Sequence, residues 1–126
     1  DHILAILKII EKGKIGETYN IGGDNEQNNL FVVNKICEIL DSKINSKPKG
    51  IKSFKNLISF VDDRPGHDKR YAINSEKIKK ELDWFPSVNF EKGLGDTVDW
   101  YISNSTWWDN IISGSYNLKR QGKLET

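Results

Sequence analysis

Hydrophobic residues recur at three- and four-residue spacing in four stretches of the chain. Residues with this spacing share one face of a helix, so the pattern predicts four amphipathic helices. The first should end at Gly13, because glycine adopts the left-handed conformation that closes many helices without a Cβ clash. The second should begin after Asn29, whose side chain suits an N-cap, and the third after Asn74 or Ser75. The apolar positions are Ile3, Ile6, Leu7 and Ile10; Val33, Ile36, Cys37 and Leu40; Ile78 and Leu82; and Phe90, Leu94, Thr97 or Val98, and Tyr101.

Three shorter segments have the pattern of β-strands. Residues 17–21 alternate between apolar and polar side chains and are followed by two glycines. Residues 57–61 form a short apolar run, and residues 71–73 resume extended structure after a polar stretch. Helices combined with a few short strands predict an α/β fold class.

Two regions lack this periodicity. Residues 41–56 are rich in Ser, Asn and Lys, contain Pro48 and Gly50, and are predicted to form an exposed loop. The apolar segments on either side of this loop look too small to fold alone, so residues 1–126 are expected to form a single portion. Residues 115–126 are expected to be a polar tail.

Composition narrows the classes of protein. The chain has 126 residues, a formal net charge of +1, one cysteine and no methionine. The small net charge gives no argument for nucleic-acid binding, and no apolar run approaches the roughly 20 residues of a membrane-spanning helix. A single cysteine excludes an internal disulfide and favours a reducing, cytoplasmic compartment. The absence of methionine is compatible with a processed start or with a piece of a longer protein.

Several kinds of site are disfavoured by the same residues. One cysteine and two well-separated histidines, His2 and His67, do not provide the spacing of a metal site. The glycines do not form the Gly-x-Gly-x-x-Gly turn that binds dinucleotides. Cys37 lies on an apolar helical stripe and is interpreted as a small buried hydrophobe. The sequence therefore indicates no metal, cofactor or catalytic residue of its own.

The residue types best suited to ligand binding cluster between residues 62 and 71. Arg64 offers a planar fork of donors for phosphate or carboxylate oxygens, and Pro65 with Gly66 favours a stiff turn. His67 can donate to an anion or stack on a base. Asp63, Arg64, Asp68 and Arg70 could instead pair with one another in a surface turn, and both interpretations stay open. Asn29 likewise either caps a helix or offers its amide to a ligand.

Basic residues also concentrate in the middle of the chain. Residues 43–80 carry eleven basic and four acidic side chains, between two acidic flanks. This distribution predicts either an anion site or a set of lysines that solvate a loop. For the lysines between residues 43 and 55, the loop interpretation is favoured.

Five segments follow one another in a recognisable order. They are Gly16-Glu17-Thr18-Tyr19-Asn20-Ile21-Gly22-Gly23, Asp63-Arg64-Pro65-Gly66-His67-Asp68, Leu82-Asp83-Trp84, Thr97-Val98-Asp99-Trp100-Tyr101 and Trp107-Trp108. Together they resemble the C-terminal third of the dTDP-glucose 4,6-dehydratase family of extended short-chain dehydrogenases. The resemblance implies a substrate-binding portion whose NAD-binding Rossmann domain, N-terminal in the family, is absent from these residues.

The resemblance also implies a reaction for the complete enzyme. In the family, NAD takes hydride from C4 of the sugar, water is eliminated across C5 and C6, and the hydride returns to C6. The product is a 4-keto-6-deoxy sugar nucleotide, on routes to deoxysugars such as rhamnose. The family's Tyr-x-x-x-Lys pair and acidic dehydration pair are not among these residues, so the chain alone is expected to be inactive. The family is typically dimeric through the missing domain.

The family's substrate-binding positions carry over to six residues. Arg64 is expected to contact the diphosphate of dTDP-glucose, and His67 and Asn29 are expected near the nucleotide or diphosphate. The full set is Asn29, Asp63, Arg64, Pro65, Gly66 and His67. Two other functions remain open: a stand-alone module that binds a nucleotide or another anion, and the C-terminal part of a related nucleotide-sugar epimerase or decarboxylase.

Overall fold

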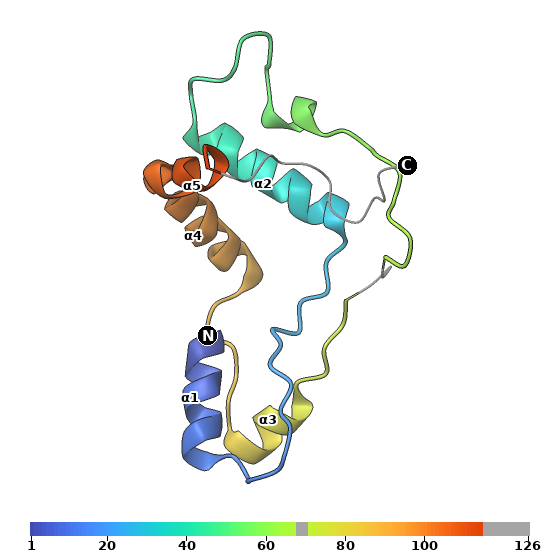
Figure 1. The fold of residues 1–126 in the computed structure, drawn as a ribbon, viewed down its shortest axis with the longest axis vertical. Helices are drawn as coiled ribbons and strands as arrows, with labels where there is room; N and C mark the ends of the chain where they lie inside the picture. The colour runs from blue at the N-terminus through green and yellow to red at the C-terminus, as the bar shows by residue number, and fades with distance from the viewer. Residues whose placement is uncertain (68–70, 115–126) are drawn as a thin grey trace. The chain divides into compact units, whose positions relative to one another are not determined.

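The computed structural model describes residues 1–67 and 71–114, and the regular structure in these ranges is helical. The elements are α1 (His2–Lys12), α2 (Asn29–Lys43), a 3-10 helix η1 (Phe54–Leu57), α3 (Glu76–Leu82), α4 (Phe90–Ser103) and α5 (Ser105–Ile112) (Figure 1). The four helices predicted from hydrophobic spacing are confirmed as α1 to α4. Helix α5 and η1 were not among the predicted helices.

The ends of these helices differ from the prediction in two places. Gly13 ends α1 in an extended conformation, with φ −67° and ψ 148°, so the expected left-handed ending is wrong. Glycine is favoured there for a different reason, since a Cβ would lie 2.5 Å from the Ile9 carbonyl oxygen. Asn29 is the first residue of α2, so it does not precede the helix as a cap. Ser75 precedes α3 as predicted, while the Asn74 side chain accepts the hydrogen bond from the Glu76 amide at 2.9 Å.

The predicted strands do not form within the described residues. Residues 17–21 and 71–74 do lie beside one another, because the Asn20 side-chain amide donates to the Asn74 carbonyl at 3.3 Å. No strand pairing joins these segments in the ranges that the structure covers. A strand is stable only when its backbone groups pair along a ladder, which alternation of side chains alone does not supply.

The chain divides into two compact units. The first comprises residues 1–28 and 70–93, and the second comprises residues 29–69 and 94–126. The single portion predicted for residues 1–126 stays a prediction about function, and the contacts within it group into these two units. Residues 115–126, predicted to be a polar tail, lie outside the described residues.

The first unit has a small core between α1 and α3. Ala5 of α1 and Ile78 and Leu82 of α3 are buried together with Trp84. The start of α1 is held to the segment that follows Trp84 by a carboxylate: Asp1 accepts hydrogen bonds from the backbone amides of residues 87 and 88 and from the hydroxyl of residue 87.

The second unit changes the interpretation of residues 41–56. Helix α2 continues to Lys43, and η1 begins at Phe54, so both ends of the predicted loop are helical. Asp41 holds the two ends together, because its carboxylate accepts hydrogen bonds from the Ser53 hydroxyl and, at 3.0 Å, from the Phe54 amide. These contacts join residues more than ten positions apart, which hydrophobic periodicity does not detect.

Two further observations concern membrane-spanning helices and metal sites. No described helix is long and apolar enough to cross a membrane. In residues 1–67 and 71–114, histidine, cysteine and acidic side chains form no group of three or more that would hold a metal ion.

Candidate functional site

The polar segment after η1 forms a tight turn in the second unit. The amide of His67 donates to the carbonyl of Arg64 at 3.4 Å, and Gly66 has a φ of +70°. Proline at the second position and a positive φ at the third are the pattern of a type II turn, which only glycine adopts easily at that position. The stiff turn predicted for Pro65 and Gly66 is therefore present.

Asp63 organises this turn through one carboxylate oxygen. Its Oδ1 accepts a hydrogen bond from the backbone amide of Arg64 at 2.8 Å and lies 2.7 Å from Nδ1 of His67. The His67 side chain is 28% exposed and the Asp63 side chain 72% exposed. The ring of His67 is thus held against the turn, while the carboxylate remains in contact with water.

Arg64 lies at the exposed start of the turn. Asp63 contacts its backbone amide, and none of the described residues pairs with its guanidinium group. Asp68 and Arg70, which the surface-turn interpretation also includes, lie outside the described residues, so that interpretation stays open. An exposed guanidinium beside a stiff turn suits bidentate contact with phosphate or carboxylate oxygens.

Asn29 does not join the turn. It is exposed at the first position of α2, and no hydrogen bond or ion pair among the described residues links it to residues 63–67. Five of the six predicted substrate-binding residues, Asp63, Arg64, Pro65, Gly66 and His67, thus form the turn itself, and Asn29 makes no hydrogen bond or ion pair with them among the described residues.

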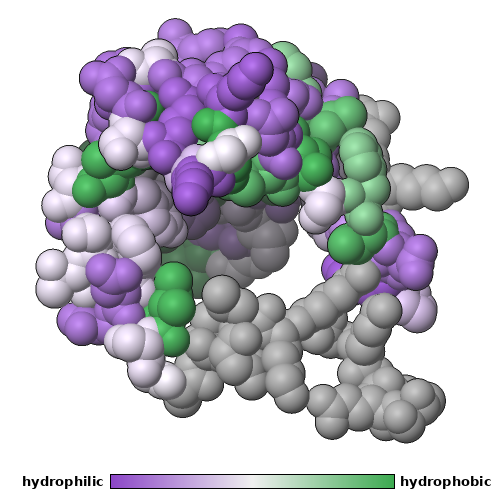
Figure 2. Space-filling model, turned by 90° about the horizontal axis from the view of Figure 1, so that it is seen from above, coloured by the Kyte–Doolittle hydropathy of each residue, from purple (hydrophilic) through white to green (hydrophobic). Residues whose placement is uncertain are grey.

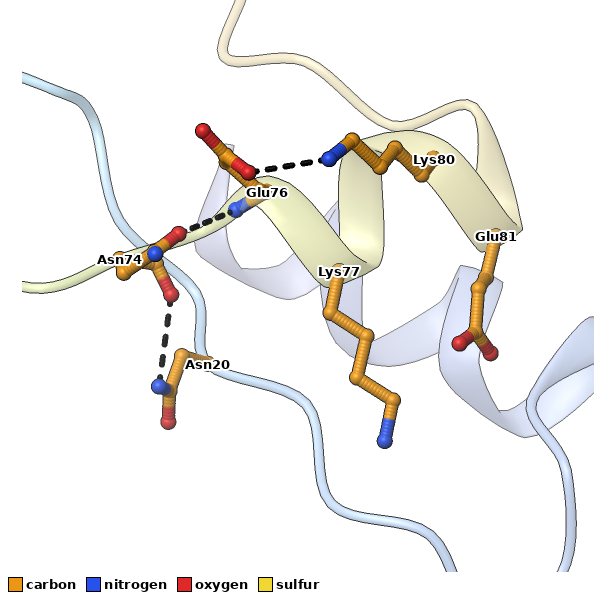
Figure 3. Close-up of a pocket in the computed structure, with 6 residues that line it drawn as sticks. All are labelled: Asn20, Asn74, Glu76, Lys77, Lys80 and Glu81. Carbon is orange, nitrogen blue, oxygen red and sulfur yellow. Dashed lines mark hydrogen bonds and ion pairs between the residues drawn. The ribbon is translucent and has the colours of Figure 1, made fainter.

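A polar pocket lies in the first unit, where the sequence indicated no site. Its volume is about 470 Å³. It is lined by Asn20, Asn74, Glu76, Lys77, Lys80 and Glu81, which come from the segment after α1, from α3 and from the residues just before α3 (Figure 3). No motif connects these residues along the chain, so sequence reasoning had no signal for the pocket.

The charges around this pocket neutralise one another. Lys77 contacts Glu17 at 2.5 Å, and Lys80 contacts Glu76 at 3.0 Å. The hydrogen bond from Lys77 lowers the pKa of Glu17 below its ordinary value of 4.5, and the same bond raises the pKa of Lys77 above 10.5. The pocket therefore offers paired charges, in contrast to the exposed guanidinium of the turn.

The second unit also contains an apolar groove, with a volume of about 630 Å³. Residues of α2, α4 and α5, with Ile44 just beyond α2, line it: Ile36, Leu40, Ile44, Leu94, Thr97, Val98, Tyr101, Ile102, Trp108 and Ile112. The Trp108 indole donates to the Tyr101 carbonyl at 2.9 Å and so ties α5 to α4. Apart from the hydroxyls of Thr97 and Tyr101 and the Trp108 indole nitrogen, these side chains are apolar, and none of them carries the charge that would orient a nucleotide.

Apolar side chains also reach the surface outside this groove. Figure 2 shows hydrophobic surface between hydrophilic residues on the face that it presents. Helix α1 is the clearest case, because most of its apolar stripe is exposed: Ile3, Leu4, Ile6, Leu7 and Ile10. Large exposed apolar patches are typical of surfaces that bind another polypeptide or a ligand.

Comparison with known sequences gives a consistent result. A family model described as GDP-mannose 4,6 dehydratase matches residues 1–97. A dTDP-glucose 4,6-dehydratase from Neisseria meningitidis serogroup B is 49% identical over 122 residues, which cover 97% of this chain and 34% of that protein. A dTDP-glucose 4,6-dehydratase from Escherichia coli is 50% identical over 125 residues, which cover 99% of this chain and 34% of that protein.

A solved structure agrees with these matches. The crystal structure of a dTDP-glucose 4,6-dehydratase from Bacillus anthracis in complex with NAD superposes with a TM-score of 0.72 and 45% sequence identity. The match covers 87% of this chain and 31% of that chain. The chain thus spans about a third of the length of the curated relatives it matches.

Proposed function

From the premise that the chain belongs to the GDP-mannose 4,6 dehydratase family, we propose that it is the nucleotide-sugar-binding part of a dTDP-glucose 4,6-dehydratase. The turn formed by residues 63–67 is the observation that carries this proposal. It combines an exposed guanidinium with a backbone conformation that its proline and glycine favour. Relatives that share 49% and 50% identity with the chain are named for action on dTDP-glucose.

Arg64 is assigned to the diphosphate of the substrate. A guanidinium forms two parallel hydrogen bonds to phosphate oxygens, and such charge-assisted bonds are stronger than neutral ones. Pro65 and Gly66 shape the turn that presents it, and His67 lies at the other end of the turn. Asn29 is assigned to the same substrate through its amide, although it lies outside the turn.

NAD belongs to a different part of the enzyme. Gly22 and Gly23 follow residues 17–21, but the next helix begins only at Asn29, so no helix N-terminus meets these glycines. Binding of a dinucleotide phosphate needs that combination of a glycine turn and a helix start. The described residues therefore do not fit NAD, and we assign the cofactor and the catalytic residues to the portion of the relatives that this chain does not match.

The exposed stripe of α1 supports the same division. Ile3, Leu7 and Ile10 face away from the small core of the first unit. We assign the NAD-binding portion of the enzyme as the surface that covers them. We also predict that two complete enzymes associate through that portion. A cytoplasmic location of the enzyme remains a prediction as well.

A chimera tests the proposed function. In it, this chain replaces the segment that it matches in the Neisseria meningitidis enzyme. The chimera should convert dTDP-glucose to a keto sugar, and the 126-residue chain alone should not, even with added NAD. Turnover by the chain alone would show that catalysis does not need the other portion. A folded chimera without turnover would count against the assignment to this enzyme, and it would favour a stand-alone module if the chain alone still bound dTDP.

A further inference from the structure

The contact between Asp63 and His67 gives these two residues different roles. We propose that Asp63 is a positioning residue, which holds the His67 imidazole in the tautomer that carries its proton on Nδ1, and that Asp63 does not itself contact the ligand. The importance of this contact for ligand binding rests on the proposed function of the turn. The contact itself is present in the chain without a ligand.

The tautomer follows from the chemistry of the two atoms. Oδ1 of Asp63 lies 2.7 Å from Nδ1 of His67, well within hydrogen-bond distance. An ionised carboxylate only accepts hydrogen bonds, so the proton of this bond must lie on Nδ1. A neutral imidazole in water favours the opposite tautomer, with its proton on Nε2. The carboxylate therefore selects a form of the ring that solvent alone would not.

Asp63 is unsuited to contact an anionic ligand directly. Its Oδ1 already receives the Arg64 amide at 2.8 Å in addition to the His67 ring. A carboxylate placed against a diphosphate would also add like-charge repulsion, which costs affinity. Both hydrogen bonds instead point into the turn, so the carboxylate stabilises the conformation in which Arg64 is presented.

The selected tautomer determines what the ring recognises. When Nδ1 carries the proton, Nε2 of the neutral ring has a lone pair and accepts a hydrogen bond. The ligand group that matches this atom is a donor, such as a sugar hydroxyl, whereas a phosphate oxygen is an acceptor. In this tautomer the hydrogen-bonding character of Nε2 is that of an acceptor, opposite to that of the Arg64 guanidinium, which only donates.

Nuclear magnetic resonance of the imidazole nitrogens tests the proposal on the whole chain. The sequence has two histidines, so a His2→Gln variant assigns both rings. The spectra are recorded near pH 8.5, about two units above the ordinary histidine pKa of about 6.5. We expect the nitrogen shifts of His67 to report the Nδ1–H tautomer and those of His2 to resemble free histidine.

Three variants separate positioning from a general structural effect. Asp63→Ala should move His67 to the solvent-preferred tautomer. Asp63→Asn should retain the Nδ1–H form, because its side-chain oxygen still accepts the bond. Asp62→Ala, the adjacent exposed carboxylate, should leave the tautomer unchanged. An Nε2–H tautomer in the unaltered chain, or the same spectrum in Asp63→Ala, would overturn the proposal.

Adding dTDP to the same samples distinguishes this proposal from the proposed function. If the ligand-free spectra show the Nδ1–H tautomer and dTDP does not change the His67 nitrogen shifts, the positioning role of Asp63 is supported. Nucleotide binding by the chain is then not supported. If dTDP changes the His67 nitrogen shifts but the ligand-free tautomer is Nε2–H, nucleotide binding by the chain is supported. The positioning role of Asp63 is then overturned.

Discussion

Two helices of the first unit carry the same kind of hydrophobic stripe, but one stripe is buried and the other is mostly exposed. Helix α3 buries its stripe, with Ile78 at 0% and Leu82 at 4% exposure. Helix α1 buries Ala5 against α3 and leaves most of its larger apolar side chains in solvent, with Ile10 at 74% exposure. Periodicity therefore shows which face of a helix is apolar, but it does not show whether the same chain covers that face.

The difference separates residues that stabilise this chain from residues that stabilise a larger protein. Burial of a leucine or isoleucine side chain contributes about 1.5–3 kcal/mol relative to exposure. Helix α3 gains this stabilisation within the first unit. Helix α1 gains it only when another surface covers Ile3, Leu7 and Ile10, and we assign that surface to the NAD-binding portion of the enzyme.

The largest expected effect comes from the buried helix. Ile78→Ala should lower the free energy of unfolding of the chain by about 2–5 kcal/mol, because it leaves a cavity in the core. Denaturation with urea measures the change. Ile10→Ala is the matched control, since it removes the same atoms from an exposed site and should change stability by no more than about 0.5 kcal/mol. Equal changes in the free energy of unfolding at the two positions would show that α1 and α3 do not differ in how their apolar side chains stabilise the chain.

The same Ile10→Ala substitution should behave differently in the chimera with the Neisseria meningitidis enzyme. If the NAD-binding portion covers α1, the substitution should destabilise the chimera by about 2 kcal/mol or more, because the site is then buried. Thermal unfolding of the chimera with and without the substitution gives the comparison. A chimera that tolerates Ile10→Ala as well as the chain alone does would show that the exposed stripe is not an interface with that portion.

The smallest expected effect concerns the polar contacts around α3. Hydrogen bonds from Lys77 to Glu17 and from Lys79 to Asp24 lower the pKa of each carboxyl below its ordinary value, 4.5 for Glu17 and 3.8 for Asp24. A lowered pKa in the folded state contributes stability that is present above these values and is lost as the pH falls through and below them. Urea denaturation between about pH 6 and pH 3 should therefore show declining stability.

Replacement of the lysines isolates this contribution. Lys77→Met should flatten the decline by removing the bond to Glu17, whereas Lys92→Met in α4 leaves both of these pairs in place. A decline of the same slope in Lys77→Met would mean that other groups cause the acid sensitivity.

The helices could be predicted from the sequence because helix formation depends on neighbours three and four positions away. The stripe of Ile78 and Leu82 is local, and the structure confirms both the helix and its buried face. Residues 17–21 alternate as a strand does, but a strand needs a second strand to pair with. Their neighbours at residues 71–74 supply a side-chain contact without a ladder.

The candidate site was predictable to a similar extent. Pro65 and Gly66 specify a turn by their own backbone preferences, and that turn is present. The bond from Asp63 to His67 and the position of Asn29 depend on conformation beyond adjacent residues, so the sequence did not separate their roles. The pocket beside α3 joins residues more than fifty positions apart, and no local pattern marks it.

Calorimetric titration of dTDP into the chimera tests the assignment of the turn most directly. Arg64→Ala should weaken binding by roughly 1.5–3 kcal/mol, the contribution of a hydrogen bond to a charged group, which corresponds to a roughly ten- to 150-fold rise in Kd. Lys52→Ala, another exposed basic residue of the second unit, should leave Kd within about twofold, the scale of a surface substitution. Equal Kd values for Arg64→Ala and the unaltered chimera would contradict the assignment of the turn to the nucleotide diphosphate.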